Sequence, residues 1–141
     1  MNPNRSIVLE TVVSLLYWIL LAAALWLLLR GHNSPGGGFV AALVAVAATA
    51  ARALVFGTGA ARARLPLGPL GLSALGLALA AASGLPALAL GQAFLTHWWG
   101  ELALGGMALK LSTVLLFDVG VALCVWGALG GFCLRLLETV R

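Results

Sequence analysis

The chain has 141 residues, of which 62% are hydrophobic and only 9% are charged, and its mean hydropathy is +1.10. A soluble domain carries about 25% charged residues, so this composition excludes a water-soluble globule. The net charge of +4 comes from arginines in loops and near chain ends, and in a membrane protein such arginines set orientation before they suggest nucleic-acid binding.

The apolar runs predict an all-α integral membrane protein with a single membrane domain, residues 1–141. A helix needs about 20 apolar residues to cross the bilayer core. Four spans are predicted, at about residues 6–29, 39–57, 67–85 and 112–136, with an outer loop at 30–38 and an outer semi-apolar connection at 86–111. Pro86 should end or kink the third helix, because proline removes a donor and clashes with the preceding turn. We expect the connection to lie along the membrane surface as a short helix or loop.

The positive charges predict that both termini are cytoplasmic. With four spans, the basic residues divide unequally between the two sides. One side would hold Arg5, Arg52, Arg62, Arg64, Arg135 and Arg141, and the other only Arg30 and Lys110.

The first predicted helix carries one carboxylate, Glu10, aligned with Ser6, Ser14 and Tyr17 at helical spacing. Two interpretations stay open for it. Glu10 could be a solvated interfacial group near Arg5, or a carboxylate on a proton path.

The outer loop reads Arg30-Gly31-His32-Asn33-Ser34-Pro35-Gly36-Gly37-Gly38-Phe39. Ser34 and Pro35 suit an N-cap and a first helical position, and a first turn of glycines lets another backbone approach closely. The stretch is no phosphate loop, since no lysine follows and no strand precedes. We therefore predict a surface that contacts a neighbouring subunit, formed by His32, Asn33, Pro35, Gly36, Gly37 and Gly38.

Asp118 lies inside the last predicted span, where a carboxylate costs roughly 2.5–3.5 kcal/mol on insertion scales. It could fix subunit packing through a hydrogen bond, take a direct proton or sodium role, or lie too near the interface to matter. A stripe of small residues, predicted to pack helices closely, recurs at helical spacing about 200° away from it: Gly120, Cys124, Gly127 and Gly131. Because both faces then need protein partners, the pattern predicts an interior position in a larger assembly.

Three stretches resemble the B subunit of Mrp-type multisubunit cation/proton antiporters. They are the glycine-rich loop, the segment Gly91-Gln92-Ala93-Phe94-Leu95-Thr96 with the Trp98/Trp99 pair and Gly100-Glu101, and the run from Ser112 to Val121 that contains Leu116-Phe117-Asp118. The chain departs from the family pattern after Val121, where Ala122-Leu123-Cys124 replaces the usual bulky residue.

The resemblance implies a small, non-catalytic subunit of a prokaryotic inner-membrane antiporter that exchanges sodium for protons. Its implied partners are large subunits related to respiratory complex I and other small membrane subunits. Asp118, Glu10 and Thr113 are the candidate residues for an ion path or for intramembrane packing. No cofactor is expected beyond transported Na⁺ and H⁺, and no metal-ligand spacing is present.

Other functions stay open at this point. The chain could be the equivalent subunit of a membrane-bound hydrogenase, or an assembly subunit with no ion contact. It could also be a free-standing four-helix exporter of cations or drugs, although such exporters are shorter and lack the outer glycine loop.

Overall fold

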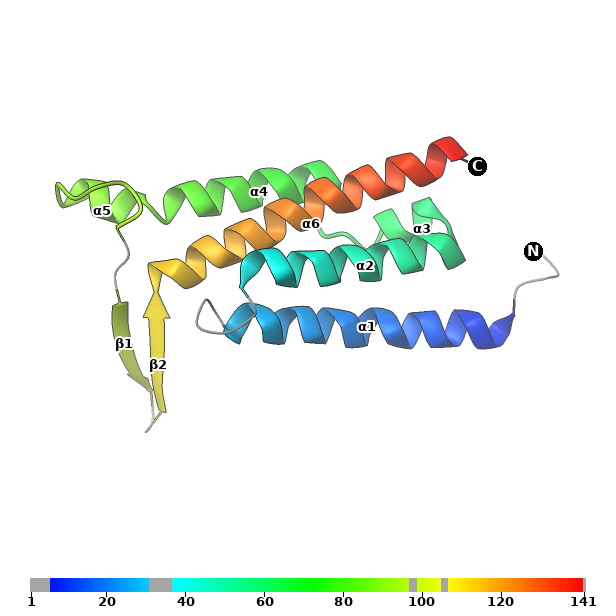
Figure 1. Ribbon diagram of the computed structural model, residues 1–141, viewed down its shortest axis with the longest axis horizontal. Helices are drawn as coiled ribbons and strands as arrows, with labels where there is room; N and C mark the ends of the chain where they lie inside the picture. Colours follow the sequence, from blue (N-terminus) through cyan, green and yellow to red (C-terminus); the bar gives the residue numbers. More distant parts are fainter. Residues whose placement is uncertain (1–5, 31–36, 97–98, 105–106, 141) are drawn as a thin grey trace.

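The computed structural model describes residues 6–30, 37–96, 99–104 and 107–140, and within these it is an elongated bundle of helices (Figure 1). The elements run in the order α1 (Ile7–Arg30), α2 (Gly38–Phe56), α3 (Thr58–Arg62), α4 (Gly68–Ala82), α5 (Leu85–Ala89), β1 (Trp99–Leu104), β2 (Met107–Ser112) and α6 (Thr113–Val140).

Four stretches are long and apolar enough to cross a membrane: Ile7–Arg30, Gly38–Phe56, Gly68–Ala89 and Thr113–Val140. The helical membrane fold expected from the sequence is therefore confirmed. The first described residues of α1 and the end of α6 lie at the same end of the bundle (Figure 1).

Local chemistry explains where the helices begin and end. The Ser6 hydroxyl accepts a hydrogen bond from the Leu9 backbone N–H at 3.4 Å, which caps α1. Gly37 precedes α2 with φ +93°, and Gly57 follows α2 with φ +91°, a region of backbone conformation that favours glycine. The Gly57 N–H donates to the Ala53 carbonyl at 2.9 Å and closes the last turn of α2.

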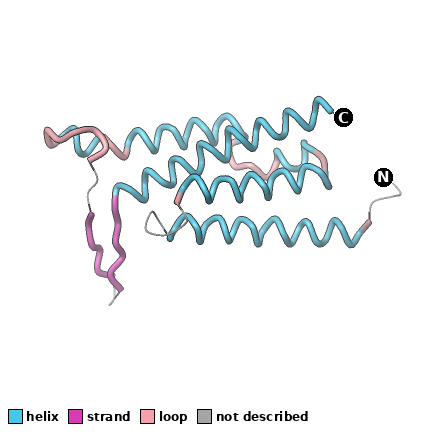
Figure 2. Tube along the Cα trace, viewed as in Figure 1, coloured by secondary structure: helices cyan, strands magenta, loops and turns pink. Residues whose placement is uncertain are grey.

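Helix α6 runs through the middle of the bundle, with α4 along one side and α2 along the other, while α1 packs on α2 (Figures 1 and 2). The alanine-rich face of α2 lies in these contacts, because Ala41, Ala42, Ala45, Ala48 and Ala53 are all buried. Small side chains allow α1 and α6 to approach α2 closely. The packing partners of α2, which its alanine-rich sequence did not reveal, are therefore α1 and α6.

The outer connection is more regular than expected. Helix α4 ends at Ala82, and after a turn the chain resumes as the short α5, which has proline at its start. β1 and β2 then form an antiparallel hairpin whose register pairs Trp99 with Ser112 (magenta in Figure 2). The sequence expectation of a helix or loop missed this hairpin, although its alternating apolar pattern around Gly105-Gly106 is typical of one.

Candidate functional site

Glycines of α4 and α6 bring the backbones of these two helices into close contact. A Cβ atom added to Gly76 would collide with the backbone N–H of Cys124 and lie 2.5 Å from the Gly120 carbonyl oxygen. A Cβ on Gly120 would in turn lie 2.5 Å from the Ala80 nitrogen and 2.7 Å from the Gly76 carbonyl oxygen. The two backbones therefore touch, and only glycine fits at both positions.

The same contact continues toward the end of α6. A Cβ on Gly127 would lie 2.6 Å from the Pro69 carbonyl oxygen, and one on Gly131 would lie 2.7 Å from the Pro69 ring. The Ser73 hydroxyl hydrogen-bonds the Cys124 carbonyl at 3.3 Å and its own helix's Pro69 carbonyl at 3.0 Å. All four residues of the predicted small-residue stripe thus lie along α4 of the same chain.

Asp118 lies on the other side of α6, against the start of α2. It is the sixth residue of α6, about 7.5 Å from the first at 1.5 Å per residue, and only 3% of its surface is exposed. A Cβ on Gly38 would collide with the Asp118 carbonyl oxygen, so the first turn of α2 rests on the α6 backbone at this point. The N–H groups at the start of α2 carry a partial positive charge, which favours a carboxylate nearby.

Both faces of α6 are therefore covered by helices of this chain: the Gly120 face by α4 and the Asp118 position by α2. The prediction that both faces of α6 meet protein is confirmed, but helices of the same chain supply both contacts. These two faces therefore do not by themselves indicate a position inside a larger assembly.

The glycine loop is only partly within the described residues. His32, Asn33, Pro35 and Gly36 lie outside them, so their predicted role in subunit contact stays a prediction. A Cβ added to Gly37 would have open space around it, with no heavy atom within 4 Å, whereas one added to Gly38 would meet α6 of the same chain.

We expect Gly37→Leu to reduce the amount of assembled protein. Its φ of +93° disfavours any side chain by about 1–2 kcal/mol, and the added bulk would obstruct a neighbour at the loop. The measurement is the yield of the chain and its co-purifying subunits after mild solubilisation. Gly59→Leu is the matched control, because Gly59 also has open space around it but lacks the positive φ; equal yields for both variants would contradict the prediction.

The other candidate residues are not brought together with Asp118. Glu10 lies in the first turn of α1, at the opposite end of the bundle from the start of α6 (Figure 1). Thr113 is the first residue of α6, five residues before Asp118 and so about 140° around the helix from it. No single polar site unites these three residues.

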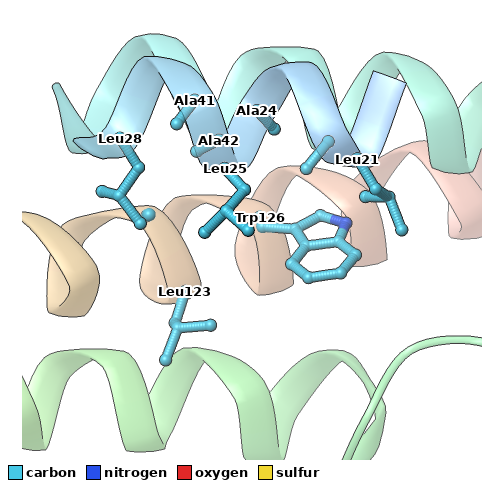
Figure 3. A pocket seen from close by; sticks show the side chains of 10 residues that line it. Leu21, Ala24, Leu25, Leu28, Ala41, Ala42, Leu123 and Trp126 are labelled. Atoms are coloured by element: carbon cyan, nitrogen blue, oxygen red, sulfur yellow. The ribbon is translucent and has the colours of Figure 1, made fainter. Parts of the chain in front are cut away.

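Two polar contacts were missed by sequence reasoning. The Trp126 indole N–H donates to the Thr49 hydroxyl at 2.9 Å, and that hydroxyl donates to the Ala45 carbonyl at 2.9 Å. Trp126 also lines an apolar cavity of about 210 Å³ between α1, α2 and α6 (Figure 3). The available signal was Thr49 itself, a lone hydroxyl in the alanine-rich second span.

Within the described ranges, no group of three or more histidine, cysteine, aspartate or glutamate side chains could hold a metal ion. Among the described residues, the polar groups of the long helices include the buried Asp118 at a helix contact and the hydroxyls of Thr49 and Ser73 in interhelical hydrogen bonds. Arg52 and Tyr17 add a charged and a phenolic side chain near the opposite end of the bundle. These contacts pack the helices of the chain against one another.

The fold and these contacts define a small, multi-pass integral membrane subunit with close glycine-mediated helix packing. A family model described as a domain related to the MnhB subunit of Na⁺/H⁺ antiporter matches residues 8–131. The chain belongs to this MnhB family.

Individual relatives agree with the family match. The B subunit of the Na(+)/H(+) antiporter of Bacillus subtilis (strain 168) is 34% identical over 131 residues, which cover 90% of this chain and 91% of that protein. The protein of the same description from Alkalihalophilus pseudofirmus is 30% identical and covers 88% of this chain and 87% of that protein.

A solved structure also matches. A chain in the structure of the Mrp complex from Dietzia sp. DQ12-45-1b superposes with a TM-score of 0.77 and 33% identity. The match covers 93% of this chain but only 14% of that chain, so this fold corresponds to a small part of a much longer polypeptide there.

Proposed function

We propose that this chain is a non-catalytic integral subunit of a multisubunit Na⁺/H⁺ antiporter of the Mrp type. The observation that carries the proposal is the family match over residues 8–131, which includes nearly all of the four candidate spans except the last turns of α6. The similarity to a chain in an Mrp complex, at a TM-score of 0.77, supports the same assignment. Its partners are then the other membrane subunits of that antiporter.

The distribution of charge supports the proposed orientation. Arg52, Arg62, Arg64 and Arg135 all belong to segments at the end of the bundle where α1 begins and α6 ends, while Arg30 ends α1 at the opposite end. We place the arginine-rich end in the cytoplasm, following the tendency of basic residues to remain there.

Asp118 is the proposed contact between this subunit and the ion path. A buried ionisable residue within a span marks ion or proton pathways in many membrane proteins. Its position at the junction of α2 and α6 also lets it hold the two helices together, and the variant described in the Discussion separates the two roles.

The relatives favour the antiporter over the other possibilities. Both relatives described above are called antiporter subunits, which supports neither a free-standing exporter nor the hydrogenase alternative. A subunit role also accounts for the absence of one united polar site among the described residues.

Deletion of this chain from its host is expected to abolish sodium-driven proton exchange in everted membrane vesicles. The chain supplied on a plasmid should restore exchange only when the other subunits are present. The measurement is dequenching of a ΔpH-sensitive dye after addition of Na⁺. Undiminished exchange after deletion, or exchange by the chain alone, would contradict the proposed function.

A further inference from the structure

Arg52 is a charged side chain held within a membrane-crossing helix by aromatic rings. Its guanidinium carbon lies 4.6 Å from the centre of the Phe56 ring and 5.5 Å from that of Tyr17. Such cation–π contacts stabilise a guanidinium that lies over an aromatic ring. The Arg52 Nε is buried and has no hydrogen-bond partner among the described residues, so part of its binding capacity is unused.

A second guanidinium lies close to Trp18, the residue that follows Tyr17 in α1. Arg64, in the segment after α3, lies over the ring of Trp18 at 5.8 Å. The Tyr17 and Trp18 rings lie 5.3 Å apart, so the two guanidinium groups flank one pair of adjacent aromatic residues. Arg62 pairs with Glu138 at 3.0 Å, but no ion pair of this kind joins Arg52 or Arg64 to a described carboxylate. An anion bound between these two guanidinium groups would be attracted by both positive charges.

The apolar cavity begins one turn further along α1. Leu21, Leu25 and Leu28 line it, and they follow Trp18 at spacings of three, four and three residues, so all four belong to one face of the helix. On α2, the Thr49 hydroxyl accepts a hydrogen bond from the Trp126 indole, which lines the cavity. Thr49 precedes Arg52 by about one helical turn, so Arg52 lies near this end of the cavity. Leu25 lines the cavity (Figure 3) and is 57% exposed, so one wall of the cavity borders the surface of the bundle.

Arg52, Arg64 and the apolar cavity together form what we call the lipid groove. We propose that this groove binds an anionic phospholipid. The phosphate lies between Arg52 and Arg64, beside Trp18 at headgroup level, and one acyl chain lies in the cavity between α1 and α6. An amphiphile fits both halves of the groove, whereas a carboxylate from a neighbouring subunit would use only the charged half. Lipid binding at this position does not require ion transport, because it depends on charge and cavity shape alone.

The test is a lipid titration by native mass spectrometry, on the delipidated chain with its co-purifying subunits. Dioleoyl phosphatidylglycerol and dioleoyl phosphatidylcholine share acyl chains and differ in net charge. We expect tighter binding of phosphatidylglycerol, and a roughly 30-fold loss of that binding in the Arg52→Gln/Arg64→Gln variant, since each basic residue contributes about fivefold toward an anionic lipid. Ala122→Phe, which fills the cavity, should weaken both lipids.

Arg30→Gln is the matched control, because Arg30 also stacks on an indole, Trp26 at 4.7 Å, but at the other end of α1. It should bind like the wild type. If the double variant is not stable, Arg64→Gln alone suffices, since Arg64 is exposed and lies outside the long helices.

Several results would overturn the proposal. Equal binding of the two lipids, or wild-type binding by the arginine variants, would remove the headgroup site. Displacement by inorganic phosphate would indicate a small-anion site in place of a lipid site. Loss of a co-purifying subunit with unchanged lipid binding would show that the arginines pair with an acidic residue of that subunit.

Discussion

Gly76→Ala is expected to separate α4 from α6 and to lower the stability of the folded chain by about 2 kcal/mol. Overpacking a closely fitted contact costs about 1–3 kcal/mol, and the atoms in the way belong to the backbone of Cys124 and Gly120, which cannot rotate aside. The gain in helix propensity from glycine to alanine, up to about 1 kcal/mol, offsets only part of this cost. The difference in unfolding temperature is measured by heating the protein in detergent and detecting the cysteine thiols as unfolding exposes them to a thiol reagent.

Gly130→Ala on α6 is the matched control for this substitution. A Cβ there would meet only the Trp126 ring, at 3.6 Å, an ordinary van der Waals contact. It should leave the unfolding temperature unchanged or raise it. Similar unfolding temperatures for Gly76→Ala and Gly130→Ala would show that the two helices can move apart at little cost.

Asp118→Asn is expected to leave assembly intact and to reduce sodium-driven proton exchange by roughly tenfold or more. The reason is that ionisable residues inside membrane spans mark ion and proton pathways. Asparagine keeps the size of the side chain and can still accept hydrogen bonds through its amide oxygen, but it carries no charge and cannot transfer a proton. The packing role and the ion role therefore give different results. Exchange in everted vesicles and the subunit content of the purified complex are measured on the same preparation.

Glu138→Gln is the control for loss of a carboxylate. Glu138 pairs with Arg62 near the end of α6 and is 40% exposed, so its neutralisation should cost at most about 1 kcal/mol and leave exchange unchanged. Loss of assembly in Asp118→Asn would assign Asp118 to packing, and normal assembly with normal exchange would exclude it from the ion path.

Sequence reasoning worked best where a single physical requirement decides the outcome. Crossing a bilayer demands long apolar helices, and for this reason the helical membrane fold was predictable. The small-residue stripe from Gly120 to Gly131 was visible at helical spacing, because close packing requires small residues whatever the partner.

The partner of that stripe was not predictable, because a stripe records that something approaches closely and not what approaches. The complementary pattern was present on α4, where Ser73, Gly76 and Ala80 recur three and four residues apart. Two such patterns in one chain could have indicated an intramolecular contact. The contact between Gly38 and Asp118 gave no such signal, because a contact between two single residues leaves no repeating pattern in the sequence.

Helix α1 begins and helix α6 ends at the same end of the bundle (Figure 1), as four membrane crossings require. A polypeptide continuing from either end would therefore emerge on one side of the bilayer, without an additional crossing. This property would let the fold be joined covalently to another membrane protein at either end. It also means that reporter domains attached at the two ends would share one compartment.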